Sequence, residues 1–233
     1  RLHPGGESLT LLDHGKAQVI QLASGRLVRA FDTGNPFVAA LSPDGLTVAA
    51  LSRKGILTVW DARSAQTIDS WVFSGNAAPT LRISNDARVL ALADSDATVH
   101  LIQRTRTGLW RDRPFPPPAS YDDSIGHVEA YLAEDGSRLA LWYYSRIGMH
   151  ENRCAWRLYE TRTGKARDED SYSASNCEDL GVVLSPSGRY LADLADGILI
   201  VYSGRSPTLR NTGRRTEHMA FSPRESLIAI EEA

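Results

Sequence analysis

The chain has 233 residues, and its 26 lysines and arginines against 28 aspartates and glutamates give a formal net charge of −2, too small to recruit nucleic acid or an anionic membrane. Hydrophobic residues make up 42% and charged residues 23%, which is ordinary for a globular protein and argues against disorder. No apolar run approaches the roughly 20 residues of a membrane helix, so the sequence predicts no membrane span.

A short turn followed by an apolar run recurs along the chain. The best copy is Ser42-Pro43-Asp44-Gly45, which is followed by the apolar run 47–51. A repeat of roughly 40–45 residues is typical of the four-stranded blades of a β-propeller. The sequence therefore predicts five repeat periods, with partial units at both ends. The turns lie near residues 4, 43, 85, 134, 186 and 223.

Further strands are predicted within each period from β-branched and aromatic residues between turn residues. In the second unit, 56–60 forms the third strand, 61–64 a turn and 66–72 the fourth strand. Helical periodicity appears nowhere over a useful length. The fold class is therefore all-β, with antiparallel four-stranded blades. The other expected third strands are 18–22, 98–102, 154–159 and 198–202.

One unit resembles a blade of the WD-repeat family. Trp60-Asp61 stands where the family's Trp-Asp dipeptide ends the third strand, and Gly126-His127 is similar to the family's Gly-His before the first strand. The resemblance covers nearly the whole chain and implies a β-propeller in which His127 has a structural role. Because the other units lack Trp-Asp and most lack Gly-His, a degenerate or bacterial-type propeller fits better than a regular eukaryotic WD protein.

The phase of the repeat indicates an incomplete ring. The sequence opens at the end of a first strand and stops at Ala233, after the second strand of a sixth unit. Propellers close by pairing their ends into one blade, since an open edge leaves backbone groups unpaired. We therefore expect residues 1–233 to form a single incomplete propeller domain. It would be a fragment of a six- or seven-bladed ring in a longer protein with additional domains.

Loop length points to a binding site in the fourth unit. In the WD-repeat arrangement, the loop between second and third strands and the connection between blades emerge on one face. The segments 111–126, 145–153 and 166–179 enlarge that face around the fourth unit, and they predict an acidic, aromatic-edged surface for a basic partner. The alternative is solvated insertions at loop tips. The candidate partner-binding residues are Tyr121, Asp122, Asp123, Arg146, His150, Asp168, Glu169, Asp170 and Tyr172.

The two cysteines, Cys154 and Cys177, fall in the same region. A disulfide between them would staple the enlarged loops and would indicate an oxidising compartment, periplasmic or extracellular. The alternative is two buried free thiols, which would agree with a cytoplasmic location.

The motifs of common catalytic and cofactor sites are absent from the sequence. It has no Gly-x-Ser-x-Gly, no His-Glu-x-x-His and no phosphate-binding Gly-x-x-x-x-Gly-Lys-Ser/Thr, and its six histidines lack metal-ligand spacing. Trp110 lies near Arg111 and Arg113, a combination that can bind nucleic acid. The acidic segments nearby oppose that interpretation, so we expect no nucleic acid, metal or cofactor.

Two functions from different classes remain. The first is a non-catalytic scaffold or sensor that binds a protein or peptide through the enlarged loops. The alternative is a propeller enzyme or small-ligand-binding propeller that uses the mouth of the central channel, because a fold does not fix a function. Polar residues that converge on the channel would favour the second function, and a broad acidic, aromatic surface would favour the first.

Overall fold

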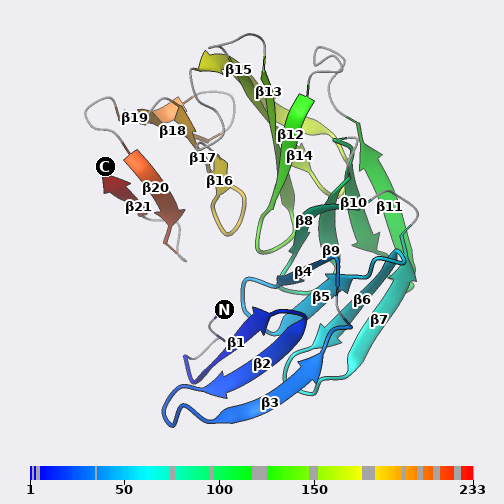
Figure 1. Ribbon diagram of the computed structural model, residues 1–233. Helices are drawn as coiled ribbons and strands as arrows, with labels where there is room; N and C mark the ends of the chain where they lie inside the picture. The colour runs from blue at the N-terminus through cyan, green and yellow to red at the C-terminus, as the bar shows by residue number, and fades with distance from the viewer. Residues whose placement is uncertain are drawn as a thin grey trace. The chain divides into compact units, whose positions relative to one another are not determined.

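The computed structural model describes residues 1, 3, 6–34, 36–73, 77–94, 97–116, 125–146, 152–174, 182–195, 198–203, 207–211, 216–222 and 227–232. Every regular element among these residues is a β-strand, and the sheets are built from strands that follow one another in the chain (Figure 1). The chain divides into two compact units, Arg1–Pro114 and Phe115–Ala233, and each unit has its own blades. The predicted all-β fold class is confirmed. A single propeller domain over residues 1–233 stays a prediction.

The first unit contains one three-stranded and two four-stranded sheets, which we call blades 1, 2 and 3. Blade 1 consists of β1 (Ser8–Asp13), β2 (Lys16–Gln21) and β3 (Leu27–Asp32). Blade 2 consists of β4 (Val38–Leu41), β5 (Thr47–Leu51), β6 (Ile56–Asp61) and β7 (Thr67–Val72). Blade 3 consists of β8 (Ala77–Ile83), β9 (Val89–Asp94), β10 (Val99–Arg104) and β11 (Trp110–Phe115).

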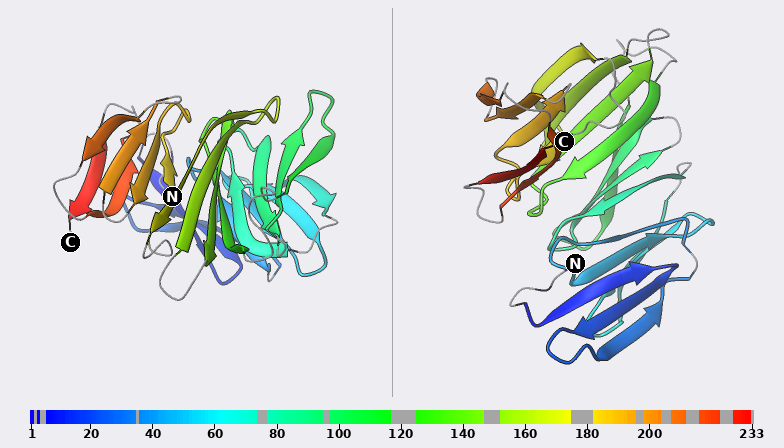
Figure 2. Two further views of the ribbon diagram at one scale, coloured as in Figure 1. Left: turned by 90° about the horizontal axis from the view of Figure 1, so that it is seen from above. Right: turned by 60° about the vertical axis from the view of Figure 1, so that its left-hand side comes forward.

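The second unit contains two four-stranded sheets, blades 4 and 5, and one two-stranded sheet. Blade 4 consists of β12 (Ile125–Leu132), β13 (Arg138–Arg146), β14 (Asn152–Glu160) and β15 (Ala166–Ala174). Blade 5 consists of β16 (Val182–Leu184), β17 (Leu191–Ala195), β18 (Ile198–Tyr202) and β19 (Pro207–Asn211). The last sheet is β20 (Thr216–Phe221) with β21 (Ile228–Glu232). Figure 2 shows the strands of each blade side by side in chain order.

The repeated turn joins the first two strands of a blade through side-chain hydrogen bonds. Ser42 Oγ donates to Asp44 Oδ1 at 2.6 Å and accepts the Thr47 N–H at 3.0 Å. In blade 3, Ser84 Oγ donates to Asp86 Oδ1 at 2.7 Å in the same way. Serine and aspartate favour such turns because their short side chains satisfy the local backbone. The repeat seen in the sequence is therefore a repeat of turn chemistry.

These repeated turns also link neighbouring blades. We call the end of a blade at which its repeated turn lies the lower end. In the first unit, Thr10 Oγ1 donates to the Gly45 carbonyl at 2.8 Å, and the Asp44 N–H donates to Asn85 Oδ1 at 2.9 Å. In the second unit, the Glu134 N–H donates to the Pro186 carbonyl at 2.9 Å. The opposite, upper end of each four-stranded blade carries the connection between its second and third strands.

The core of each unit lies between adjacent blades. In the first unit, Leu51 and Leu57 of blade 2 pack in one cluster with Leu90 of blade 3. In the second unit, Trp142 and Trp156 of blade 4 pack in one cluster with residues of blade 5. Successive side chains of a strand point to opposite faces of the sheet, so a blade with a neighbour on each side can have two apolar faces. Packing against the two neighbouring blades buries both faces.

Candidate functional site

Blade 4 is longer than the other described blades. β12 has 8 residues and β13, β14 and β15 have 9 each, whereas the strands of blade 2 have 4 to 6. The extra length lies at the upper end, because Arg146 pairs with Asn152 and Asn152 pairs with Ala174 beyond the last paired rows of the other blades. We call residues 125–128, 143–146, 152–155 and 171–174 the blade 4 extension.

Parts of the loops that the sequence predicted around blade 4 are strands in the structure. Residues 145–146, 152–153 and 166–174 of the predicted loops are strand, and part of the expected connection 111–126 belongs to β11 and β12. Tyr143 and Tyr144 explain the outcome on β13, because aromatic residues favour strands and pair well across them. The connections around blade 4 are therefore shorter than the sequence suggested.

The predicted partner-binding residues fall into three groups. Arg146 pairs with Asn152 and Tyr172 pairs with Cys154, so both backbones belong to the extension. Asp168, Glu169 and Asp170 lie on β15, just below it. Tyr121, Asp122, Asp123 and His150 lie outside the described residues.

The three acidic residues of β15 do not form one patch. Consecutive side chains of a strand point to opposite faces. Tyr202 Oη of blade 5 donates to Asp170 Oδ2 at 3.0 Å, so Asp170 faces blade 5. Glu169 faces the other way and accepts a hydrogen bond from Arg157 Nε of β14. Asp170 therefore links two blades, and Glu169, with 59% of its side chain exposed, is accessible from solvent.

Cys154 lies in the extension and is completely buried. Its sulfur is part of a disulfide. Cys177 lies outside the described residues, so the Cys154–Cys177 bond stays a prediction. Such a bond would tie β14 to the connection that follows β15.

A row of side chains that the sequence did not reveal crosses blade 4 on the face toward blade 5. Glu129 pairs with Trp142, Trp142 with Trp156, and Trp156 with Asp170, one residue from each strand. The two indole Nε1–H groups are buried and have no hydrogen-bond partner among the residues that the structure describes. The Trp142 and Tyr144 rings stack with centroids 6.4 Å apart. This row lies directly below the extension, and its two tryptophans pack in the cluster with blade 5.

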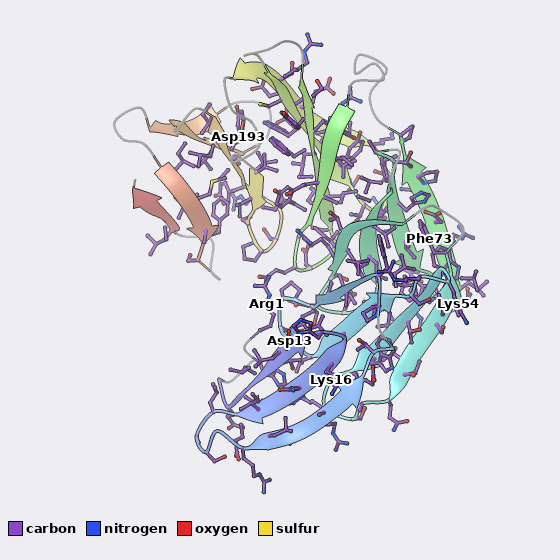
Figure 3. All side chains as sticks on the ribbon, in the orientation of Figure 1. Arg1, Asp13, Lys16, Lys54, Phe73 and Asp193 are labelled. Atoms are coloured by element: carbon purple, nitrogen blue, oxygen red, sulfur yellow. The ribbon has the colours of Figure 1, made fainter. Side chains whose placement is uncertain are left out.

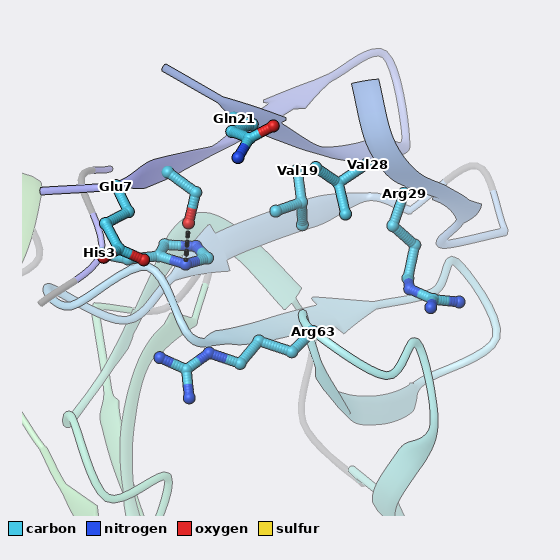
Figure 4. Close-up of a pocket in the computed structure, with 8 residues that line it drawn as sticks. His3, Glu7, Val19, Gln21, Val28, Arg29 and Arg63 are labelled. Carbon is cyan, nitrogen blue, oxygen red and sulfur yellow. Dashed lines mark hydrogen bonds between the residues drawn. The ribbon is translucent and has the colours of Figure 1, made fainter. Parts of the chain in front are cut away.

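The first unit has a pocket of about 210 Å³ between blade 1 and the lower end of blade 2 (Figure 4). One of its lining side chains, His3, is buried, with Nδ1 2.9 Å from Ser8 Oγ and Nε2 2.6 Å from Thr10 Oγ1. Both ring nitrogens are thus engaged in holding the turn. The pocket is lined by His3, Glu7, Ser8, Val19, Gln21, Val28, Arg29 and Arg63.

The pocket does not assemble a reactive group. Figure 4 shows the Arg29 and Arg63 side chains reaching to different sides rather than converging on one point. No group of three histidine, cysteine or acidic side chains suited to a metal ion occurs within the described ranges. Nor does that part of the chain contain a helix long and apolar enough to cross a membrane.

The buried His3 gives the first unit a predictable response to pH. Burial, reinforced by the charge of Arg63, lowers the pKa of His3 below its ordinary value of about 6.5. In acid the unfolded chain therefore binds a proton that the folded chain does not. We expect the free energy of unfolding to fall as the pH decreases from about 6.5 toward the lowered pKa, and this contribution to level off below it.

Urea unfolding at a series of pH values, with wild type and His3→Gln side by side, checks this expectation. Glutamine can hydrogen-bond but does not titrate, so the variant should lose this part of the pH dependence. If the free energy of unfolding changed with pH equally in the two proteins, His3 would not be the source of the pH dependence.

Comparisons with known proteins identify the fold and leave the family open. No family model matches the chain, and no curated protein matches it. Among solved structures 1205 chains match, so the fold is a common one. One of them is the β-propeller domain of Cps50 (Swd1) from Myceliophteria thermophila, with a TM-score of 0.63 and 15% sequence identity over 100% of this chain and 77% of that chain. At this identity the likeness shows the fold alone, and the chain therefore has the β-propeller fold that its turn repeat predicts.

Proposed function

We propose that this chain is a non-catalytic propeller that binds a protein partner through the upper end of blade 4. The blade 4 extension carries this proposal. Blade 2 packs against its neighbours with strands of 4 to 6 residues, so the added rows of blade 4 exceed what packing needs. Recognition sites are commonly loops on a rigid scaffold, and longer strands would hold such loops beyond the rest of the blade.

The candidate residues suggest a basic partner. The connections on either side of the extension contain Tyr121, Asp122, Asp123 and His150 in the sequence, and the extension itself contains Arg146 and Tyr172. Within the acidic group of β15, Glu169 and Asp170 are both exposed, but Asp170 is on the opposite face and accepts a hydrogen bond from Tyr202 of blade 5. We assign Glu169 to partner contact, and we assign Asp168 and Asp170 to the face toward blade 5. Aromatic side chains within an acidic surface would provide anchors for a basic segment.

Affinity capture from the native host with the full chain tests the proposal. One variant replaces residues 147–151 with a short Asn-Gly turn, which joins β13 to β14 directly. A second reverses the acidic charge assigned to partner contact, Glu169→Lys, and its control reverses an exposed charge at the lower end of the same blade, Arg162→Glu. We expect a protein that wild type and the control both recover and that the shortened variant and Glu169→Lys both lose.

The opposite results are equally clear. A partner retained by both the shortened variant and Glu169→Lys would place the binding site elsewhere. Recovery of no protein at all would remove the protein-binding function and leave the small-ligand alternative. Unchanged thermal unfolding of each variant ensures that a lost partner reflects a lost surface.

A further inference from the structure

Blade 1 covers only the lower half of the blade 2 face against which it packs. The contact consists of Leu12, Ala17, Val19 and Phe31 of blade 1 with Leu41, Val48, Trp60 and Ala62 of blade 2. These blade 2 residues all lie near the lower end, since Leu41 ends β4, Val48 begins β5 and Trp60 nearly ends β6. The upper part of the same face is left open.

An apolar row occupies that open part. Trp60, Thr58 and Ile56 alternate onto one face of β6, and Ile56 pairs directly with Val72 of β7. Phe37 precedes β4 at the inner edge of the same end of the blade, where its N–H donates to the Leu51 carbonyl at 2.8 Å. The exposed fractions are 39% for Phe37, 41% for Ile56 and 70% for Val72.

Two uncompensated cations border this row. Arg53 and Lys54 form the turn between β5 and β6, both are exposed, and neither has an ion-pair partner within the described part of the chain. The Arg53 guanidinium lies over the Phe37 ring, 5.5 Å from its centroid. Figure 3 labels Lys54 at this end of the blade. We call Phe37, Arg53, Lys54, Ile56 and Val72 the blade 2 shelf.

Two other cations of the first unit lie beside acidic residues, unlike Arg53 and Lys54. Lys16 pairs across the strands with Asp32, and Arg104 contacts Asp69 at 3.1 Å. The shelf therefore combines exposed apolar side chains with a local positive charge, on a chain whose net charge is −2. Exposed apolar groups beside charge of one sign mark surfaces that a complementary partner covers.

We infer that the blade 2 shelf binds an extended protein segment in which apolar side chains stand beside aspartate or glutamate. The apolar side chains would cover Ile56 and Val72, and the carboxylates would meet Arg53 and Lys54. An anionic membrane is the less favoured occupant, because surface binding to lipid uses larger basic clusters and deeper apolar insertion. This site lies in the other unit from the blade 4 extension and prefers the opposite charge, so it goes beyond the proposed function.

A labelled synthetic peptide of about ten residues with alternating leucine and glutamate is the probe, and fluorescence polarisation with the full chain is the measurement. We expect binding that salt weakens. The double variant Arg53→Glu/Lys54→Glu should weaken it at least about tenfold, because both charges then repel the peptide. Val72→Ser should also weaken it, and this exposed position can change without disturbing the fold. The control is Arg88→Glu/Arg106→Glu, which reverses two exposed charges of blade 3 and should leave the affinity unchanged.

Each other result overturns the inference. These results are no binding to wild type, equal affinity for wild type and the Arg53/Lys54 variant, and equal binding of a leucine–lysine peptide. Phosphatidylserine vesicles that bind wild type in place of the peptide, and lose binding with the Arg53/Lys54 variant, would identify a membrane surface instead. The shelf variants leave blade 4 unchanged, so a partner captured through blade 4 would still be recovered with them.

Discussion

Replacing Trp156 with alanine should lower the free energy of unfolding of the second unit by about 3–5 kcal/mol. The side chain is only 1% exposed and lies in the cluster between blades 4 and 5. Its ring meets Tyr202 of blade 5 edge-on, with centroids 4.9 Å apart. Alanine would remove both the buried area and this contact, and it would leave a cavity that two stacked sheets cannot close.

Two further variants, compared with Trp156→Ala by urea unfolding, separate the causes of this loss of stability. Trp156→Phe should cost much less than Trp156→Ala, because most of the ring volume is kept and the indole N–H has no partner to lose among the described residues. Trp60→Ala should also cost less, because Trp60 is only partly buried. Equal losses for Trp60→Ala and Trp156→Ala would contradict the assignment of the core to the blade interface.

Gly188→Ala should lower the free energy of unfolding by about 2–4 kcal/mol, because two costs add at this position. Gly188 has φ +67°, a conformation that side chains disfavour. A Cβ there would also lie 2.5 Å from Arg138 Cβ and 3.1 Å from Ala133 Cβ. Arg138 Cβ is fixed to the backbone of blade 4, so the lower turn of blade 5 would have to move away.

Gly25→Ala is the matched control, again by urea unfolding. Gly25 has φ +64°, and nothing lies within 4 Å of a Cβ added there. This variant should therefore show only the backbone cost, about 1–2 kcal/mol. If Gly188→Ala were no more destabilising than Gly25→Ala, the close approach of blade 5 to blade 4 would be refuted.

The sequence predicted the blades because the turn signal is local. Ser42 and Asp44 lie two residues apart and bond to each other, so the motif can be read without knowing any tertiary contact. The third strands were equally legible, because Ile56–Asp61 is rich in β-branched and aromatic residues bounded by turns. Both signals are present although most units lack the Trp-Asp and Gly-His dipeptides.

The strand character of 166–174 was missed for a physical reason. Asp168, Glu169 and Asp170 are residues that strands disfavour, and three in a row are typical of a solvated loop. Outer strands of a sheet tolerate charge because one of their edges faces solvent, and charged residues there discourage further strand pairing. The division of the three side chains between two faces followed only once the strand was known.

Contacts between blades could not be predicted at all. The burial of His3 depends on Thr10 and on the next blade, and the exposure of Ile56 and Val72 depends on how little of blade 2 is covered by blade 1. Neither property follows from the neighbours of these residues in sequence. Tyr121, Asp122, Asp123 and His150 stay predictions, since they lie outside the described residues.

Hydrogen exchange of the full chain, alone and with the partner that it captures, tests the central claim most directly. If the partner binds the blade 4 extension, backbone amides in 143–146, 152–155 and 171–174 should exchange more slowly in the complex, while those of the lower turns should not change. Slower exchange confined to other blades, with the extension unaffected, would contradict the assignment of the binding site to blade 4.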